Sequence, residues 1–340
     1  MDRIRTRCRR LLPLLLLTLV SACASSTGGG PDEEAPAPEY VAGETYYGTY
    51  EYIEYLPGDL PLIITAPHGG YLQPPEIPDR SGAGIVTVPD SRTQELARQL
   101  RDTFQTQIGG IPYIVICRLA RTKLDANRNL AEGALGDPRA ATAWNEWHTF
   151  INAAKQRVEE DFGQGLYIDL HGHGHEIPRL ELGYLLSSSD LAQDDSALND
   201  SAYIIKSSMR TLTNVSDSTF ASIIRGDASF GTLIETLGYP AVPSSLQPSP
   251  GSDPYFSGGY NTRVHGSRTG NTYISGLQIE CNYRGVRDSE ANRAAFSQAV
   301  AGALESFFAA HFDIPLAPAA AAEQRSMSGA FSLVGPTGGP

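Results

Sequence analysis

The fold is best indicated by one segment, Leu62-Ile63-Ile64-Thr65-Ala66-Pro67-His68-Gly69-Gly70. Its first five residues form an apolar run with the length of a buried strand. The two glycines after His68 allow a sharp backbone turn and the close approach of another group. We therefore expect the imidazole of His68 to face a cleft at the end of this strand. A turn histidine bonded to backbone is the alternative that this segment alone leaves open.

Short apolar runs of this kind alternate with amphipathic stretches along the chain. Further strands are predicted over residues 111–117, 166–170, 184–187 and 274–282. Helices are predicted over residues 90–104, 140–162, 202–212, 229–237 and 288–312. Asp90 and Asp288 are the expected N-caps of the first and last helix. This alternation predicts one α/β domain with a mixed, mostly parallel sheet covered by helices on both faces.

The composition fits a folded, acidic protein. The chain has 340 residues, 41% of them hydrophobic, which is enough for a full core, and a formal net charge of −12. Binding to nucleic acid needs a basic face, so the acidic balance argues against such a partner.

The N-terminus has the composition of an export signal. Residues 1–10 are rich in arginine, and residues 11–20 form an apolar run too short to span a bilayer. The small residues before Cys23 resemble the lipobox of bacterial lipoproteins, which implies cleavage before Cys23 and its acylation. An ordinary secretory signal is the alternative. We expect a lipid-anchored protein of the cell envelope, on the outer membrane and facing the periplasm.

The expected domain organisation has four parts. A signal peptide (1–22) is followed by a flexible tether (23–44), a folded domain (45–315) and a loose C-terminal tail (316–340). The domain contains Cys117 and Cys281, which would meet an oxidising compartment after export. The sequence leaves open whether these two pair or remain buried thiols.

A histidine-rich segment follows the predicted strand 166–170. In Asp169-Leu170-His171-Gly172-His173-Gly174-His175, three histidines alternate with glycine and would share one face of an extended chain. Neutral imidazole is a preferred zinc ligand. Because glycines loosen this geometry, we predict His171 as the ligand, and His173 and His175 as residues that line the pocket. Asp169 is a candidate to hold the ring N–H of a ligand unless it points away. A polar loop without metal is the alternative.

Glu280 lies near the end of the apolar strand 274–282. A buried carboxylate is costly unless it is paired or functional. Beside a metal-bound water it would act as a general base, and a structural ion pair is the alternative. His68, His171 and Glu280 all lie near carboxyl ends of predicted strands, where ligands bind in such sheets.

Arginines surround the segment Asp125-Ala126-Asn127-Arg128-Asn129. An arginine fork suits the recognition of a carboxylate, and a second arginine, Arg121, could stabilise an oxyanion. Solvated loop arginines are the alternative. In the polar segment 258–266, Arg263 or His265 could contact substrate or donate a proton, and a plain surface loop is equally open.

Five short motifs occur in a fixed order between about residues 68 and 285. They resemble the N-formylglutamate amidohydrolase family, which is related in fold to the zinc carboxypeptidases. The 125–129 run also resembles the substrate-carboxylate motif of pancreatic-type carboxypeptidases. The motifs are Pro67-His68-Gly69-Gly70, Asp90 with Glu95 and Leu96, Arg121 to Arg128, Asp169-Leu170-His171 and Gln278-Ile279-Glu280.

The resemblance implies a phosphorylase/hydrolase-like fold, as in zinc carboxypeptidases, and a role for each matched residue. His68 and His171 would bind zinc together with an acidic third ligand. Glu280 would activate the zinc-bound water and later pass its proton to the leaving nitrogen, and Arg121 would help to polarise the scissile carbonyl. The substrate's carboxylate would be held by Asn127 and Arg128.

The identity of the acidic ligand is left between two residues. Asp90 matches the amidohydrolase pattern best. Glu95 is the alternative, five residues further on and about 140° around a helix, so the two are not expected to bind one ion.

The sequence thus predicts a zinc-dependent hydrolase that cleaves an amide bond of a carboxylate-bearing N-acyl amino acid or peptide. A carboxypeptidase for cell-wall or nutrient peptides is the alternative among enzymes. A metal- or ligand-binding lipoprotein without catalysis is the alternative from another class, and it would need neither the base Glu280 nor Arg121. The export signal argues against N-formylglutamate itself, because its breakdown is expected in the cytoplasm.

Overall fold

The computed structural model describes residues 39–319 of the chain. The expected signal peptide and the lipidation of Cys23 lie outside the described residues, as do most of the tether and of the tail. The packed part of the domain runs from Tyr40, whose ring meets Tyr55 edge-on, to the buried Leu316 and Ala317. Within residues 39–319, no helix combines the length and apolarity that crossing a membrane requires.

One mixed sheet of eight strands forms the centre of the domain, in the order β1-β2-β4-β3-β5-β8-β6-β7. The four central strands β4, β3, β5 and β8 are parallel, whereas β2 and β6 run antiparallel to their central neighbours. This confirms the predicted mixed, mostly parallel sheet. The strands are β1 (Tyr46–Tyr47), β2 (Ile53–Leu56), β3 (Leu62–Ala66), β4 (Tyr113–Cys117), β5 (Gly165–Gly172), β6 (Leu180–Gly183), β7 (Ala241–Val242) and β8 (Ile274–Cys281).

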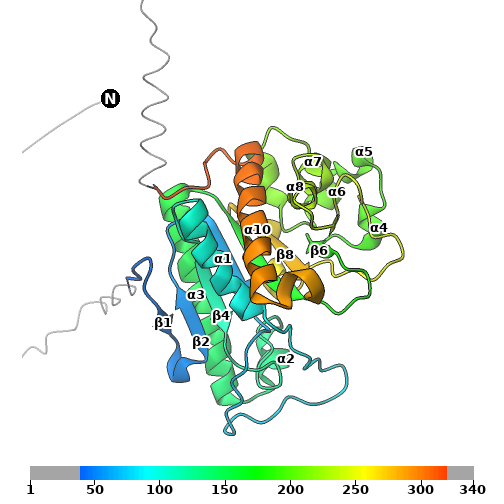
Figure 1. Ribbon diagram of the computed structural model, residues 1–340. Coiled ribbons are helices and arrows are strands. Elements are labelled where there is room, and N and C mark those ends of the chain that lie inside the picture. The colour runs from blue at the N-terminus through cyan, green and yellow to red at the C-terminus, as the bar shows by residue number, and fades with distance from the viewer. Residues whose placement is uncertain (1–38, 320–340) are drawn as a thin grey trace, which may run out of the picture. The chain divides into compact units, whose positions relative to one another are not determined.

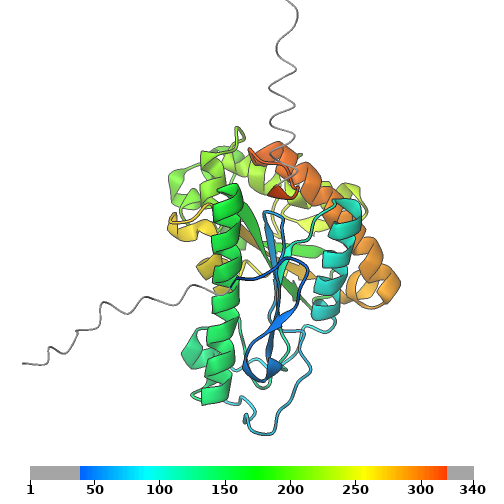
Figure 2. The same cartoon turned by 90° about the vertical axis from the view of Figure 1, so that its left-hand side faces the viewer.

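Helices cover both faces of the sheet (Figures 1 and 2). Helices α1 (Thr93–Gln107) and α10 (Glu290–His311) pack side by side on one face, and α3 (Pro138–Phe162) covers the other. The shorter helices are α2 (Leu130–Ala134), α4 (Ser188–Leu191), α5 (Asp195–Leu198), α6 (Ser201–Ile204), α7 (Phe220–Arg225), α8 (Phe230–Thr236) and α9 (Tyr260–His265), with single turns η1 (Thr49–Glu51), η2 (Arg210–Asn214), η3 (Ser267–Thr269) and η4 (Tyr283–Arg287).

The alternation of side chains along the central strands places the polar residues on one face. In β5, Leu166, Ile168 and Leu170 belong to the core beneath α1 and α10. Asp169 and His171 therefore point to the opposite face, because successive side chains of a strand alternate. The same alternation along β8 and β6 brings a row of polar side chains to that face near the carboxyl ends of the central strands.

Register extends this row across three neighbouring strands. His171 of β5 is paired with Glu280 of β8, and Glu280 is paired with Glu181 of β6. Residues directly opposite each other share a face of the sheet. The fold therefore aligns an imidazole and two carboxylates in one row.

Two predicted helix starts are wrong. Helix α1 begins at Thr93, with Arg92 at the N-cap position and a left-handed φ of 72°. Asp90 precedes this helix and turns its carboxylate towards His68 and His171 instead of capping. Helix α10 is capped by Ser289, whose side chain accepts the N–H of Asn292, and not by Asp288.

Three further predicted elements are wrong. The strand expected over 184–187 is β6, four residues earlier, where Leu180 and Leu182 alternate with Glu181 and Gly183. The helix expected over 202–212 is broken into α6 and η2, because the backbone of Ser208 bonds Tyr184 and Gly276. The polar loop expected over 258–266 contains helix α9.

Cys117 and Cys281 are free, buried thiols. They lie on β4 and β8, with β3 and β5 between them, and belong to the cores on opposite faces of the sheet. Three strand spacings amount to about 14 Å, and a disulfide needs Cα atoms within about 7 Å. Burial raises the pKa of each thiol to about 12, so both stay protonated at neutral pH.

Candidate metal centre

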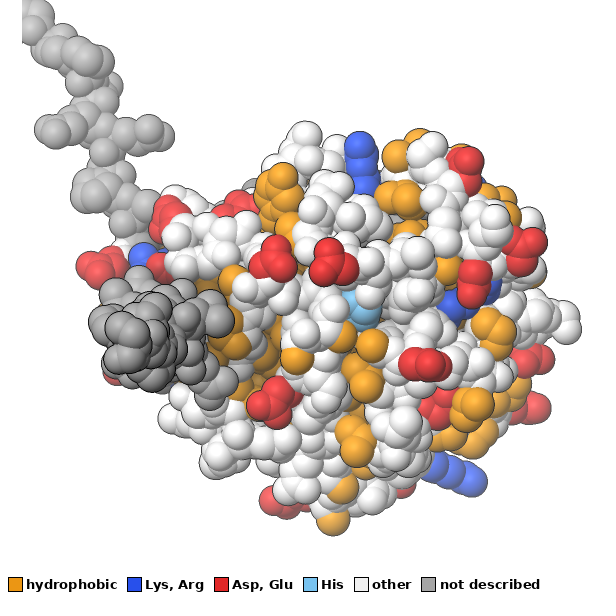
Figure 3. Space-filling view, turned by 90° about the horizontal axis from the view of Figure 1, so that it is seen from above, with side chains coloured by type: hydrophobic (Ala, Val, Ile, Leu, Met, Phe, Trp, Pro, Cys, Tyr) orange, Lys and Arg blue, Asp and Glu red, His pale blue; other side chains and the backbone are white. Residues whose placement is uncertain are grey.

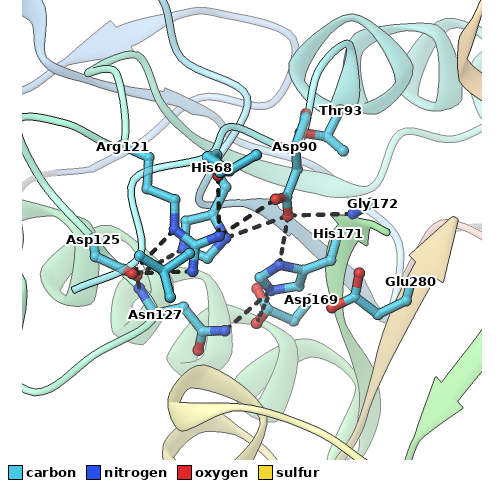
Figure 4. A network of polar contacts seen from close by, with 12 residues as sticks. His68, Asp90, Thr93, Arg121, Asp125, Asn127, Asp169, His171, Gly172 and Glu280 are labelled. Carbon is cyan, nitrogen blue, oxygen red and sulfur yellow. Dashed lines mark hydrogen bonds and ion pairs between the residues drawn. The ribbon is translucent and has the colours of Figure 1, made fainter. Parts of the chain in front are cut away.

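Three buried side chains converge at the carboxyl ends of β3 and β5. His68 follows β3, Asp90 lies in the loop before α1, and His171 lies in β5. Asp90 Oδ2 lies 2.9 Å from His171 Nδ1 and 3.3 Å from His68 Nδ1. One potential ligand atom from each residue lies within 4.8 Å of the others, and the side chains point toward one another (Figure 4). Two imidazole nitrogens and a carboxylate oxygen are a donor set that suits zinc.

Each imidazole is held from behind by a second carboxylate. Asp125 Oδ1 lies 2.7 Å from His68 Nε2, and Asp169 Oδ2 lies 2.8 Å from His171 Nε2. Metal-binding histidines usually donate their other ring N–H to such an oxygen, which fixes the tautomer and the ring orientation. Both Nδ1 atoms are thereby directed into the cluster. Asp169 points towards His171 and not away from it, as the period of two in β5 requires.

The carboxylates of Asp90, Asp125 and Asp169 contact the two imidazoles and stabilise positive charge at this cluster. Burial opposes ionisation of Asp90 and Asp125, but His68 and neighbouring cationic groups hold the pKa of both carboxyls below the ordinary value. Burial also opposes charge on His171, yet Asp169 and Asp90 raise the pKa of His171 well above its ordinary value. A divalent cation between the Nδ1 atoms would satisfy the same carboxylates without a proton on the ring.

Arg121 joins the two aspartates at the edge of the cluster. Its Nη2 lies 3.1 Å from Asp125 Oδ2, and its Nη1 lies 3.5 Å from Asp90 Oδ1. The guanidinium also lines the adjoining pocket. Arg121 thus reaches both the ligand set and the space where a substrate would lie.

A pocket of about 720 Å³ opens beside the cluster. Exposed apolar side chains of Val86, Val88, Phe256 and Tyr283 stand around it. Acidic side chains are scattered over the face shown in Figure 3 and basic ones are fewer there, in line with the net charge of −12. Among the residues predicted for the site, those that line the pocket are Asp90, Arg121, Asn127, Arg128, His173, His175 and Glu280.

Glu280 is a buried residue of β8, and its carboxylate lies beside the cluster (Figure 4). Burial raises the pKa of Glu280 to about 8, His171 opposes this shift, and Asp90, Glu181 and Asp169 add to it. Gln278 donates a hydrogen bond of 2.9 Å from its Nε2 to Glu280 Oε1. A cation held by the cluster would favour the ionised form, which can accept a proton.

Asn127 and Arg128 have different surroundings. The side-chain oxygen of Asn127 accepts the backbone N–H of Asn261 at 2.8 Å, and its Nδ2 lies 3.2 Å from His171 Nε2. Arg128 is exposed in the pocket, and no carboxylate within residues 39–319 forms an ion pair with it. Arg128 is therefore the more available of the two for an anionic group of a substrate.

Glu95, the alternative acidic ligand, lies outside the cluster. Its Oε1 accepts hydrogen bonds from Tyr71 at 2.6 Å and from Arg92 at 2.8 Å. The structure thus places Asp90, and not Glu95, beside both histidines.

Arg263 and His265 do not line the pocket, contrary to expectation. Both lie on α9, which turns His265 into the interior. His265 Nε2 lies 2.8 Å from His148 Nδ1, and Arg263 lies over the ring of Tyr260. Burial and His148 hold the pKa of His265 well below its ordinary value, and burial lowers that of His148 to about 4. This pair is a neutral part of the packing between α3 and α9.

Arg287 is a site residue that the sequence did not reveal. It is buried, and its guanidinium donates to the backbone oxygens of Cys281, Ser91 and His173. These three residues follow Glu280, Asp90 and His171 by one or two positions. A Cβ at Gly172 would collide with this guanidinium, so the glycine makes room for it. Arg287 ties together the three segments that carry the candidate ligands and base.

Asp125 and Glu181 were also missed as parts of the site. Asp125 stood in a segment that the sequence linked to substrate binding, and its contact with His68 depends on how two distant loops meet. The only sequence signal for Glu181 is its place between two leucines of a short alternating strand.

No protein-family model matches the chain. No curated protein matches it either. Among solved structures, the N-formylglutamate amidohydrolase from Ralstonia eutropha JMP134 is 14% identical with a TM-score of 0.46, over 76% of this chain and 97% of that one. A gene product from Agrobacterium tumefaciens is 14% identical with a TM-score of 0.42, over 75% of this chain and 95% of that one. A metallo-carboxypeptidase from Pseudomonas aeruginosa is 12% identical with a TM-score of 0.39, over 78% of this chain and 63% of that one.

Proposed function

We propose that this chain is a zinc-dependent hydrolase that cleaves an amide bond of a carboxylate-bearing N-acyl amino acid or peptide. The observation that carries the proposal is the meeting of His68, Asp90 and His171, with Glu280 beside them in the same pocket. Two nitrogen ligands and one oxygen ligand leave a position open for water or substrate, as in catalytic zinc sites.

The ligand residues would hold the ion through His68 Nδ1, His171 Nδ1 and the carboxylate of Asp90. When bound, zinc supplies a Lewis acid and lowers the pKa of its water to about 7. Asp125 and Asp169 keep the two imidazoles in the required tautomer by accepting their Nε2–H groups.

Glu280 is proposed as the general base. Its carboxylate shares the row with His171 and faces the pocket, so it can accept a proton from an attacking water molecule. Gln278 donates to one of its oxygens and so fixes its orientation. Arg121 would stabilise the negative charge that develops on the carbonyl oxygen.

The substrate's carboxylate is assigned to Arg128, with Asn127 beside it. Arg128 lines the pocket and forms no ion pair with another residue of the 39–319 range, and a guanidinium fork of this kind suits bidentate recognition. A pocket of about 720 Å³ lies within the usual range for drug-sized ligands. A carboxypeptidase acting on cell-wall or nutrient peptides is the second candidate, since this space also fits a peptide end.

The cellular setting is proposed from the sequence signal alone. We infer a lipid anchor at Cys23 and a place in the cell envelope, on the outer membrane and facing the periplasm. Substrates would then be N-acyl amino acids or peptides of that compartment.

The test is a comparison of the purified wild type with Glu280→Gln, loaded with zinc and supplied with a panel of N-acyl amino acids and peptides. The variant should retain one equivalent of zinc and lose hydrolysis by about 10²- to 10⁴-fold. Glu176→Gln, a change at an exposed residue outside the pocket, is the matched control and should keep full activity. Absence of bound metal in the wild type, or undiminished hydrolysis by Glu280→Gln, would contradict the proposal. Zinc binding without hydrolysis of any panel member would favour a metal-binding lipoprotein.

A further inference from the structure

We propose that His175, held by Glu181, donates the proton to the leaving nitrogen in the hydrolysis. This inference rests on the proposed function, and it assigns protonation of the leaving nitrogen to His175 instead of Glu280, to which the family resemblance assigns it. Both His175 and Glu181 lie outside the ligand cluster. In the sheet, Glu181 on β6 and His171 on β5 lie on opposite sides of β8, the strand that carries Glu280.

Glu181 fixes the imidazole of His175 through a fully buried carboxylate. Its Oε1 lies 2.7 Å from His175 Nδ1, and its Oε2 accepts the backbone N–H of Phe256 at 2.8 Å. Because a carboxylate oxygen accepts hydrogen bonds, we assign a proton to His175 Nδ1 in this contact. Within residues 39–319 no hydrogen bond involves His175 Nε2, which leaves this nitrogen for a ligand in the pocket.

The ring of His175 is also held in place by its neighbours. It stacks on Phe256 with ring centroids 4.8 Å apart and planes 7° from parallel. Its backbone N–H donates to His173 Nδ1 at 3.1 Å. Such fixed contacts reduce the conformational freedom that a proton donor would otherwise lose on reaction.

His173 cannot fill the same role. Its Nε2 donates to the backbone oxygen of Arg179 at 2.8 Å, and its Nδ1 accepts the N–H of His175. Burial lowers the pKa of His173, so this ring stays neutral. Of the two histidines, only His175 has a free ring nitrogen and a partly exposed side chain, at 26%.

The register of the sheet places this pair beside the proposed base. Glu181 and Glu280 are directly opposite on β6 and β8. Neighbouring strands lie about 5 Å apart, so the carboxylate that holds His175 stands one strand away from Glu280. A substrate in the pocket would have the base and the proton donor within reach of the same amide.

The proton balance of the reaction closes with these two groups. Glu280 takes one proton from the attacking water as the new C–O bond forms. The C–N bond then breaks, its electron pair stays on nitrogen, and that nitrogen takes the Nε2 proton of His175. His175 therefore reacts as the imidazolium and is left neutral, with its Nδ1 proton still held by Glu181. The proton on Glu280 returns to His175 through solvent, which restores both groups.

The alternative for this group is a second metal ion. His173, His175 and Glu181 each offer a ligand atom within 4.8 Å of the others. However, both ring nitrogens of His173 already bond to backbone, and the carboxylate that contacts His175 is Glu181 itself, which a metal would need as a ligand. The geometry therefore favours proton transfer, and a second zinc is an outcome that the experiment detects.

The experiment compares two substrates that differ in the leaving atom. The best N-acyl amino acid of the panel is paired with the matching O-acyl 2-hydroxy acid, whose oxygen leaves more easily without protonation. For His175→Gln, kcat on the amide should fall by about 100-fold, within the usual range for a proton donor. On the ester, kcat should fall by less than about 5-fold. Bound zinc should remain at one equivalent.

Glu181 is a positioning residue in this proposal, and its test is coupling to His175. Glu181→Gln keeps an acceptor for Phe256 and should show the same selective loss on the amide. The kcat of the double variant on the amide should lie within about 3-fold of that of each single variant. This is expected because either substitution already disables the His175–Glu181 pair. Glu176→Gln is the matched control and should leave both reactions unchanged.

Three results would overturn the proposal. Equal losses on amide and ester would show a merely structural role for His175. Two equivalents of zinc in the wild type and one in His175→Gln would identify a second metal site. A zinc-loaded wild type that hydrolyses neither substrate would remove the proposed function as well, which separates that failure from the first two.

Discussion

Two groups of histidines and carboxylates flank Glu280, and they have nearly the same composition. The ligand cluster contains His68, His171 and Asp90, whereas the neighbouring group contains His173, His175 and Glu181. Each has two imidazoles and one carboxylate within 4.8 Å. Their surroundings differ in what holds the imidazoles from behind and in how far they are buried.

The ligand cluster is fully buried and supported by charge. Asp125 and Asp169 hold the outer nitrogens of both imidazoles, and the pKa of His171 is raised well above its ordinary value against the effect of burial. In the neighbouring group, a backbone carbonyl holds His173, and burial lowers its pKa. Residue type alone therefore does not distinguish the proposed metal site from the proposed proton-transfer site. The difference lies in Asp125 and Asp169, which hold the outer ring nitrogens of the proposed ligands.

The largest expected difference between the two groups is in zinc affinity. Asp90→Asn should weaken zinc binding by more than about 100-fold, beyond the range known for outer partners of metal ligands. His173→Gln should change it by less than about 3-fold. Isothermal titration of metal-free protein with zinc measures both. A larger loss in His173→Gln than in Asp90→Asn would reverse the assignment of the two groups.

A smaller effect is expected from the carboxylates behind the imidazoles. Asp125→Asn should weaken zinc binding by about 10- to 100-fold, because it removes the charge that orients His68. Asp79→Asn is the control, since Asp79 is exposed and pairs with Lys123 at 2.8 Å, away from the cluster. Equal zinc affinity in Asp125→Asn and Asp79→Asn would mean that the outer carboxylate does not support the metal.

The smallest expected effect concerns the pH dependence of the metal-free protein. Glu280 has a folded-state pKa of about 8, above the value of about 4.3 in an unfolded chain. The folded state then binds more protons, so its stabilisation is complete below the unfolded pKa and is lost as pH rises through 8.

Between pH 6.5 and 8, this loss should amount to about 1–2 kcal/mol in the free energy of unfolding. Urea denaturation of the metal-free wild type and of Glu280→Gln measures it. The raised pKa of His171 acts in the same direction but is common to both proteins. If the free energy of unfolding of the two proteins changed equally with pH, Glu280 would be ionised over the whole range. That result would contradict the raised pKa expected from its burial.

Much of the central sheet could be predicted from local sequence. The strands at 62–66, 166–170 and 274–282 agree with β3, β5 and β8 within a few residues, because their apolar runs are continuous and buried on both faces. These strands end at His68, His171 and Glu280, so the convergence of the three residues followed from a parallel sheet. Strands β1 and β2, which form one side of the sheet, were missed, since Tyr46–Tyr47 and Ile53–Leu56 lack such a run.

The details of the site depended on contacts that local patterns do not encode. Asp90 was placed by resemblance to a family, although the helix cap predicted for it was wrong. The contact of Asp125 with His68 and the pairing of Glu181 with Glu280 depend on loop packing and strand register. The course of helix α9 decided that His265 faces the interior rather than the pocket.

The most direct measurement of the metal assignment is X-ray diffraction at the zinc absorption edge from crystals of zinc-loaded protein. We predict one anomalous peak about 2.0–2.2 Å from His68 Nδ1, His171 Nδ1 and a carboxylate oxygen of Asp90. A peak between His173, His175 and Glu181, or no peak at His68 and His171, would contradict the assignment.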